Sequence, residues 1–217
     1  MLIDLVGTPI ELLPERAAWL PETRDLIVAD LHLGKAATFR ARGIPVPEGD
    51  NSFDLERLSR LIVHHQAARV IIAGDLIHAP EAMAHGLPRQ LSRWIEECTA
   101  EVILVEGNHD RRAGTKRIPC LTLPKLEVGP LTVVHDPADF VEENPGISGH
   151  LHPAVSLRES PRRSRKHLCF WLRAGRHLVL PAFGTFTGTH PIAPSADDRV
   201  FLPLTGGVKE LPSELLV

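Results

Sequence analysis

The sequence predicts an α/β (α+β) fold, a four-layer αββα sandwich in which two mixed sheets pack together and helices flank them. In the first half, short apolar runs alternate with segments of helical periodicity, a pattern typical of a largely parallel sheet with helices beside it. Beyond Gly146, short strand-like segments follow one another across turns, which indicates a second, mostly antiparallel sheet. The length of 217 residues suits one domain with a substantial core, so we expect a single domain over residues 1–217.

The first half is expected to begin with short strands, because residues 2–20 have a strand-like pattern around a turn at residues 7–9. Continuous apolar runs, of the kind found in strands buried on both faces, follow at residues 26–29, 70–73, 102–105 and 131–134. Between them we expect two helices. Asn51 is expected to cap the start of the first, in which apolar residues recur at three- and four-residue spacing. The second is expected over residues 88–98.

The second half has four more segments with the character of strands, at residues 154–158, 167–172, 177–181 and 199–202. Two sheets that each have an apolar face to cover are expected to pack against each other. The helices would then lie on the outside of the sandwich.

The composition gives no sign of a membrane protein or of a strongly charged one. The formal net charge is −3, so binding to a nucleic acid would need a local basic patch. Three widely spaced cysteines without a C-x-x-C pair favour a reducing compartment over disulfides or a thiolate zinc site. No segment has the pattern of a signal peptide or the length of a membrane span, so we expect a cytoplasmic protein with no membrane partner.

Five polar motifs carry the chemistry, and four of them directly follow an expected strand. They are Asp30-Leu31-His32, Gly74-Asp75, Gly107-Asn108-His109-Asp110, His135 and Gly149-His150-Leu151-His152. In open α/β sheets the ligand site lies beyond the carboxyl ends of the strands, so residues far apart in sequence meet at one rim. The motifs therefore predict a dinuclear metal site at that rim.

A pair of divalent cations repel each other, and an anionic ligand shared between them reduces that repulsion, a role that suits Asp75. We expect Asp30, His32 and His152 to complete one metal site. The other would be completed by Asn108, His135 and His150. The D-x-H and H-x-H spacings favour this, because alternate residues of an extended segment project the same way. Glycines before Asp75, Asn108 and His150 allow the backbone to approach closely.

All of these donors are nitrogen or oxygen, which favours Mn²⁺, with Fe or Zn²⁺ as alternatives. Two bound metals lower the pKa of water from about 15.7 to about 7, so a hydroxide bridging them can attack phosphorus. His109 would protonate the departing alkoxide, and Asp110 would orient His109. His78, just past the Gly74-Asp75 motif, is a further candidate for the rim of the site.

Basic residues follow the metal motifs in segments expected to be loops, where guanidinium groups would hold phosphates without selecting bases. The candidates for binding substrate are Arg40, Arg42, Arg111, Arg162 and Arg163. A purely solvated role for such loops is the alternative. Phe170 or Trp171 would offer a stacking surface, although their place in an expected strand favours the core.

The order D-x-H, G-D, G-N-H-D, H, G-H-x-H resembles that of the calcineurin-like metallophosphoesterase superfamily over residues 30–152. A closer resemblance comes from residues 29–35, 39–47 and 180–188, which are similar to segments of the bacterial ligase-associated DNA damage response endonucleases. One departure is Asp136 after His135, where many members of the superfamily have glycine. It leaves open the alternative in which His150 is the sole histidine of its metal.

The resemblance implies a Mn²⁺-dependent phosphodiesterase or endonuclease that acts on DNA, single strands among the candidate substrates, in a repair pathway. It also implies an ATP-dependent DNA ligase and a helicase as partners. Two alternatives stay open, since fold and metal centre do not fix the substrate. One is a phosphohydrolase of nucleotides, pyrophosphates or lipid-linked diphosphates, and the other is a non-catalytic adaptor of a ligase complex.

Overall fold

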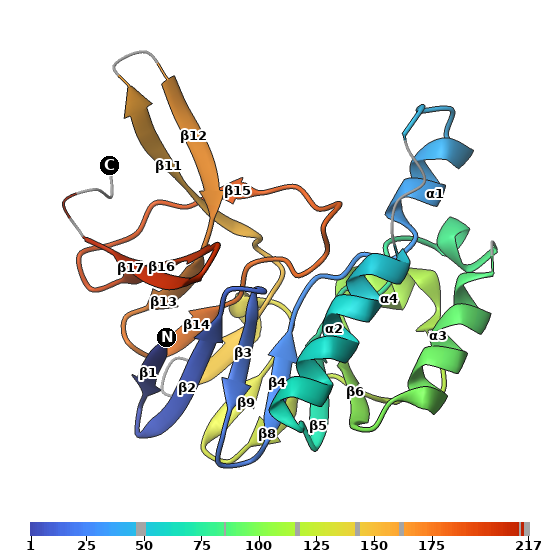
Figure 1. Ribbon diagram of the computed structural model, residues 1–217, viewed down its shortest axis with the longest axis horizontal. Helices are drawn as coiled ribbons and strands as arrows, with labels where there is room; N and C mark the ends of the chain where they lie inside the picture. The colour runs from blue at the N-terminus through green and yellow to red at the C-terminus, as the bar shows by residue number, and fades with distance from the viewer. Residues whose placement is uncertain are drawn as a thin grey trace.

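The structure is a computed structural model that describes residues 1–46, 51–84, 86–115, 118–141, 144–160, 163–212 and 214. Figure 1 shows two large sheets stacked on each other, with helices beside the first sheet and a hairpin that projects beyond the second. Each large sheet has seven strands in the described residues, and a third sheet has three. The predicted α/β class with two packed mixed sheets is confirmed.

The first sheet combines antiparallel and parallel pairing. Its strands follow chain order: β1 (Leu2–Leu5), β2 (Thr8–Leu13), β3 (Ala17–Leu20), β4 (Asp25–Val28), β5 (Arg69–Ala73), β6 (Glu101–Val105) and β7 (Leu121–Leu123). Strands β1 to β4 pair antiparallel, because the turns between them are too short for a crossover. Strands β4 to β7 pair parallel. The expected parallel sheet is thus extended by an antiparallel meander.

The second sheet is mostly antiparallel, as predicted. Its order is β17 (Gly207–Leu211), β16 (Arg199–Leu204), β13 (Phe170–Arg173), β14 (His177–Val179), β10 (Gly146–Ser148), β9 (Leu131–Val133) and β8 (Leu126–Val128). Only β10 pairs parallel to its neighbours, β9 and β14. The single strand expected over residues 167–172 is divided between β13 and β12 (Arg163–Leu168), with Cys169 between them. Strand β12 belongs to the third sheet, with β11 (Pro153–Ser160) and β15 (His190–Pro191).

Each central strand of the first sheet is buried on both faces, which explains its continuous apolar run. In β4, Leu26 and Val28 pack in the core on the helical side, whereas Ile27 packs in the core between the two sheets. Strands β5 and β6 alternate in the same way. Because neither face meets water, polar residues are excluded until each strand ends.

Four α-helices are described: α1 (Lys35–Ala41), α2 (Asn51–His65), α3 (Leu87–Glu97) and α4 (Asn108–Ala113). The two predicted helices correspond to α2 and α3, which supply leucines to the core on the helical side of the first sheet. Asn51 begins α2, and its side chain accepts a hydrogen bond from Gly34 N at 2.8 Å. None of the described helices combines the length and apolar character needed to cross a bilayer.

The outer face of the second sheet is covered differently from the first. Between residues 118 and 212, the only helical segment in the described part of the chain is the short 3-10 helix η3 (Pro137–Asp139). The apolar residues on this outer face are Val155, Cys169, Val200, Leu202 and Leu211. Val155 comes from β11, so strands rather than an α-helix form the fourth layer in this part of the chain. The physical reason is the apolar spacing, which alternates along these segments instead of recurring every three or four residues.

We predict that truncating the inter-sheet core destabilises the fold. Phe170 is fully buried between the sheets, which places it in the core rather than at a stacking surface. Replacing Phe170 with Ala should lower the free energy of unfolding by about 3–5 kcal/mol, measured by chemical denaturation, because a cavity replaces the ring. The control Val63→Ala changes a side chain that is 68% exposed and should shift stability by less than about 0.5 kcal/mol. Equal stability of the two variants would contradict the packing described.

Candidate metal centre

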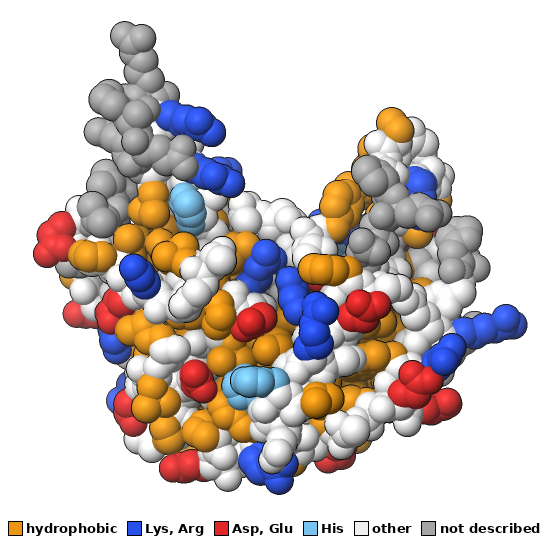
Figure 2. Space-filling view, in the orientation of Figure 1, with side chains coloured by type: hydrophobic (Ala, Val, Ile, Leu, Met, Phe, Trp, Pro, Cys, Tyr) orange, Lys and Arg blue, Asp and Glu red, His pale blue; other side chains and the backbone are white. Residues whose placement is uncertain are grey.

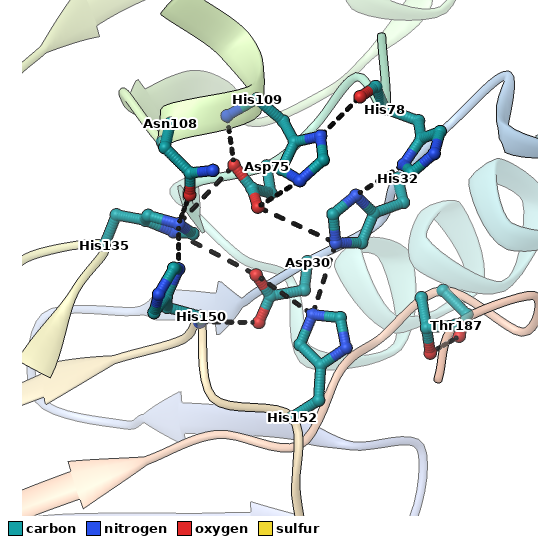
Figure 3. A network of polar contacts seen from close by, with 12 residues as sticks. Asp30, His32, Asp75, His78, Asn108, His109, His135, His150, His152 and Thr187 are labelled. Atoms are coloured by element: carbon teal, nitrogen blue, oxygen red, sulfur yellow. Dashed lines mark hydrogen bonds and ion pairs between the residues drawn. The ribbon is translucent and has the colours of Figure 1, made fainter. Parts of the chain in front are cut away.

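The seven residues proposed as metal ligands lie together at the joint rim of the two large sheets (Figure 3). Asp30 and His32 follow β4, Asp75 follows β5, Asn108 begins α4 after β6, His135 follows β9, and His150 and His152 follow β10. Six of them form two groups with ligand atoms within 4.8 Å of one another: Asp30, His32 and His152, and Asp75, His135 and His150. Because β4, β5 and β6 run parallel, as do β9 and β10, their carboxyl ends deliver these side chains to one place.

The backbone at these positions is unusual. Five of the seven residues have a positive φ, between 47° and 69°: Asp30, His32, Asp75, His150 and His152. The expected extended D-x-H and H-x-H segments are therefore replaced by tight left-handed corners, each costing about 1–3 kcal/mol. Neighbouring strands hold these corners, since Asp30 N donates to Gly74 O at 3.0 Å and His32 N donates to Asp75 O at 2.8 Å. Such strain persists only where surrounding structure enforces it, and it concentrates at functional sites.

The three glycines before Asp75, Asn108 and His150 are needed for close approach, as predicted. A Cβ added at Gly149 would lie 2.7 Å from Oδ2 of Asp30. A Cβ added at Gly107 would lie 2.3 Å from Oδ1 of Asp75, and one at Gly74 would lie 2.0 Å from Nδ1 of His135. Gly74 also has a φ of +81°, which side chains rarely adopt. The side chains of Asp75 and His135 therefore occupy the space that glycine leaves.

The first group converges on one point. Nε2 of His152 lies 3.2 Å from Nε2 of His32 and 3.6 Å from Oδ1 of Asp30. Nδ1 of His152 donates to Gly188 O at 3.0 Å, so its Nε2 carries the lone pair. Oδ1 of Asp30 is buried and has no hydrogen-bond partner in the described structure. An unpaired buried carboxylate oxygen facing two imidazole nitrogens fits a cation.

The second group is arranged in the same way, with a histidine whose Nδ1 is bonded to a backbone carbonyl. Nδ1 of His135 donates to Ala73 O at 3.1 Å, which leaves the lone pair on Nε2. That Nε2 lies 3.0 Å from Oδ1 of Asn108, 3.0 Å from Nδ1 of His150 and 3.4 Å from Oδ1 of Asp75. Asn108 thus joins this group, as the sequence suggested. The departure at Asp136 does not displace His135 from the site.

Asp75 lies between the two groups. Its Oδ1 faces His135, whereas its Oδ2 lies 3.7 Å from Nε2 of His32. Burial raises the pKa of Asp75, and the nearby charge of Asp30 raises it further, which reflects how unfavourable two buried carboxylates are without cations. Burial and the surrounding histidines lower the pKa of His32 to about 2, so its imidazole is neutral and able to bind a metal. The donor set, without sulfur, fits two divalent cations on either side of Asp75.

His109 and Asp110 are placed differently from each other. Nδ1 of His109 donates to the carbonyl of His78, and its Nε2 lies 4.0 Å from Oδ2 of Asp75, so the ring faces the centre. The carboxylate of Asp110 accepts hydrogen bonds from Ile77 N and Gly107 N, both at 3.0 Å. The expectation that Asp110 orients the His109 ring therefore needs correction. Asp110 caps α4 and ties it to the chain after β5, because the capping box draws its carboxylate back to Gly107.

His78 is part of the site, a placement the sequence left open. Its ring stacks on His109 at 5.0 Å between centroids, and its Nδ1 lies 3.3 Å from Nδ1 of His32. Leu33 and Ile77 form a parallel bridge, and His78 N donates to Leu33 O at 3.1 Å. The segment after Asp75 thus runs beside the segment after Asp30, which brings residue 78 next to His32.

The basic residues proposed for substrate binding are more dispersed. Arg42 forms an ion pair with Glu81 at 2.9 Å, and Arg111 donates to Glu106 O at 3.3 Å. Arg40 is exposed on α1, and Arg163 is exposed on β12, within a hairpin rather than the expected loop. Arg162 lies outside the described residues. Figure 2 shows a hollow between two projections, which correspond to the β11–β12 hairpin and α1 in Figure 1.

A cavity of about 400 Å³ opens beside the metal groups. It is lined by Lys35, His150, Leu151, His152, Gly188, Thr189 and His190. Two of the lining residues, His150 and His152, belong to different metal groups, so a molecule in this cavity would contact both.

The two facing donor groups at the joint rim of two sheets define a metallophosphoesterase, a hydrolase of phosphate esters. The chain belongs to the calcineurin-like phosphoesterase family, whose sequence model matches residues 24–163. Members of this family use divalent metals, which agrees with the donor groups described.

Among solved structures, the chain is similar to the Pseudomonas putida nuclease MPE, with 31% identity and a TM-score of 0.81. That similarity covers 97% of this chain and 99% of the nuclease. A phosphoesterase from E. coli, Yfce, has 13% identity and a TM-score of 0.45, with 89% of this chain and 99% of that chain covered. No curated protein sequence matched the chain at a significant level.

We predict that the metal pair depends on Asp75. Wild-type protein is loaded with Mn²⁺ and desalted, and its metal content is measured by elemental mass spectrometry. It should retain two ions per chain. Asp30→Ala should retain about one ion, because only the first group loses a ligand, whereas Asp75→Ala should lose the pair. The control Asp197→Ala removes an exposed carboxylate and should retain both ions. Two ions in Asp75→Ala would refute the shared role of this carboxylate.

Proposed function

We propose that this metallophosphoesterase is a phosphodiesterase that cleaves DNA as an endonuclease in a ligase-associated repair pathway. The observation that carries the proposal is the placement of Asp75 between two donor groups, in a chain that aligns almost end to end with a nuclease. The metal ligands in this proposal are Asp30, His32, Asp75, Asn108, His135, His150 and His152. Nitrogen and oxygen donors favour Mn²⁺, with Fe or Zn²⁺ as alternatives.

When bound, two such ions would activate a water molecule for attack on phosphorus and neutralise phosphoryl oxygens. The chain itself supports this chemistry by fixing the imidazoles. His135 and His152 are held through Nδ1 by backbone carbonyls, so both rings present Nε2 in a fixed direction. The strained corners at Asp30, Asp75 and His150 hold the donors before substrate arrives, which avoids reorganisation during the reaction.

His109 is the proposed proton donor. The carbonyl of His78 can only accept, so Nδ1 of His109 keeps its hydrogen and Nε2 is the atom that exchanges a proton. This Nε2 faces Asp75 Oδ2 from one side of the centre. A leaving oxygen bound there would receive the proton directly, while Asp110 holds the backbone that positions His109.

The hollow above the centre is the proposed path of the DNA strand. Arg163 and Lys166 on β12 are exposed on the hairpin that borders it, and Arg40 is exposed on α1 at the opposite side. Such contacts to phosphates fix a strand without selecting its sequence. The resemblance to ligase-associated endonucleases supports an ATP-dependent DNA ligase and a helicase as partners. The three widely spaced cysteines support a reducing compartment, the cytoplasm, as the proposed location.

The proposal is tested with purified protein and Mn²⁺ on three substrates: a single-stranded oligonucleotide, bis(p-nitrophenyl) phosphate and nucleoside diphosphates. We expect cleavage of the oligonucleotide at internal positions, mapped by product length, and cleavage of the aryl diester. Asp75→Asn, purified in the same way, is the control for contaminating nuclease and should lack both activities. Hydrolysis of the nucleoside diphosphates alone would replace the nuclease with a small-molecule phosphohydrolase.

We predict that His109→Ala separates substrates by their leaving groups. Loss of a general acid should slow cleavage of DNA, whose alkoxide leaves poorly, by about 10²- to 10⁴-fold. Cleavage of bis(p-nitrophenyl) phosphate should slow by less than about 10-fold, because nitrophenolate departs without a proton. The control His64→Ala alters an exposed histidine on α2 and should leave both rates unchanged. Equal slowing of both substrates by His109→Ala would exclude the acid role.

A further inference from the structure

Phe186 is an exposed aromatic side chain beside the proposed metal centre. Its relative exposure is 42%, although a phenyl ring is normally buried in a core. In the sequence, Phe186 lies between Phe183 and Gly188. Phe183 is fully buried in the core beside the helices of the first sheet, and the carbonyl of Gly188 accepts a hydrogen bond from His152. Its position is therefore coupled to the site, and its exposure needs an explanation.

A chain of ring contacts connects Phe186 with the metal groups. Phe186 meets Phe39 of α1 edge to face at 5.8 Å between centroids, and Phe39 meets His78 at 6.1 Å. His78 in turn meets His32 at 5.3 Å. The aromatic pair thus forms the rim of the centre on the side of α1.

Lys35 joins this aromatic pair to the cavity of the site. Its Nζ lies 5.9 Å from the centre of the Phe39 ring and 6.0 Å from that of Phe186. The same side chain lines the cavity beside His150 and His152. A cation thus lies between an open aromatic surface and the space where a phosphodiester would be cleaved.

The segment that carries Phe186 is tied to α2 by hydrogen bonds to Asp54 and Arg57. Oδ2 of Asp54 accepts hydrogen bonds from Thr185 N at 3.0 Å and from Thr185 Oγ1 at 3.2 Å. Arg57 donates to Phe183 O, stacks on the Phe183 ring at 3.9 Å and pairs with Asp54 at 3.2 Å. These contacts tie the backbone at Phe183 and Thr185, next to Phe186 in the chain, to residues of α2.

The other aromatic residues considered for stacking do not offer such a surface. Phe170 is fully buried, and Trp171 is partly buried, with its Nε1 donating to Asp198 at 3.0 Å. Phe53 is also exposed, at 44%, but it contacts Arg57 on α2, and no ring contact among the described residues leads from it to the metal groups. Phe186 is therefore the exposed aromatic residue whose contacts lead to the metal groups.

We propose that Phe186, backed by Phe39 and flanked by Lys35, is a stacking site for the unpaired base next to the phosphodiester that is cleaved. This inference rests on the proposed nuclease function and specifies its substrate as a single-stranded segment. Every base has a π face, so stacking on a phenyl ring tolerates any sequence, and a lysine beside it suits the neighbouring phosphate. In a duplex the base is stacked on its neighbours and would first have to be extruded.

The test uses substrates with one cleavable aryl ester: the p-nitrophenyl esters of thymidine 3′- and 5′-phosphate, and the corresponding esters of deoxyribose phosphate without a base. Wild-type enzyme with Mn²⁺ should prefer one thymidine ester over its abasic partner by about 5- to 100-fold in kcat/KM. Phe186→Ala should reduce that preference to about one. The comparison is a double-mutant cycle between the base and the ring, which isolates their interaction.

Two further variants keep the result interpretable. Phe186→Leu keeps apolar volume without a flat π face and should lose most of the preference, which guards against misfolding of the alanine variant. Phe53→Ala removes an equally exposed ring elsewhere and should keep the wild-type preference. An unchanged preference in both Phe186 variants, or none in wild type, would overturn the stacking site. If the wild-type enzyme still cleaves oligonucleotides, the nuclease proposal survives that result; if it does not, both proposals fall.

Discussion

Two buried carboxylates, Asp30 and Asp75, lie among histidine rings at a rim shared by two sheets, and the arrangement of that rim depends on how their charge is balanced. No lysine or arginine forms an ion pair with either carboxylate among the contacts of the described residues. Their partners are imidazole nitrogens, which are neutral when they bind a metal, and the backbone N–H groups of His109 and His150. Cations are the species that complete such an environment, because buried charge is tolerated only when it is paired.

The backbone is shaped around this requirement. Left-handed corners at Asp30, His32 and Asp75 turn the chain as soon as a strand ends, and backbone hydrogen bonds to the adjacent segment hold them. The strained backbone conformations at the site are unfavourable, and packing of β4 and β5 in the apolar cores on both of their faces offsets this strain. A rigid site follows from a well-packed strand end rather than from the motif residues alone.

The sequence was sufficient for the parts of this structure that follow from periodicity. Apolar runs predicted β4, β5 and β6, and the polar residues directly after them predicted which side chains meet, because parallel strands end at the same rim. What periodicity could not give depends on tertiary contacts. The partners of Asp110 are backbone groups of Ile77 and Gly107, and Thr185, next to Phe186, donates to Asp54 of α2, which is far away in the chain. The sequence pattern also did not predict that strands cover the outer face of the second sheet, since this depends on where β11 folds back.

Because β4, β5 and β6 belong to one sheet and β9 and β10 to the other, each donor group takes residues from both layers. Ions held there would be bound by residues of both sheets and would connect the two layers. Their affinity and the cohesion of the sandwich are then linked thermodynamically, so that occupancy strengthens the folded state and loosening of the apolar interface weakens retention of the ions. Binding of divalent metal at this site would therefore stabilise the fold as well as serve activity.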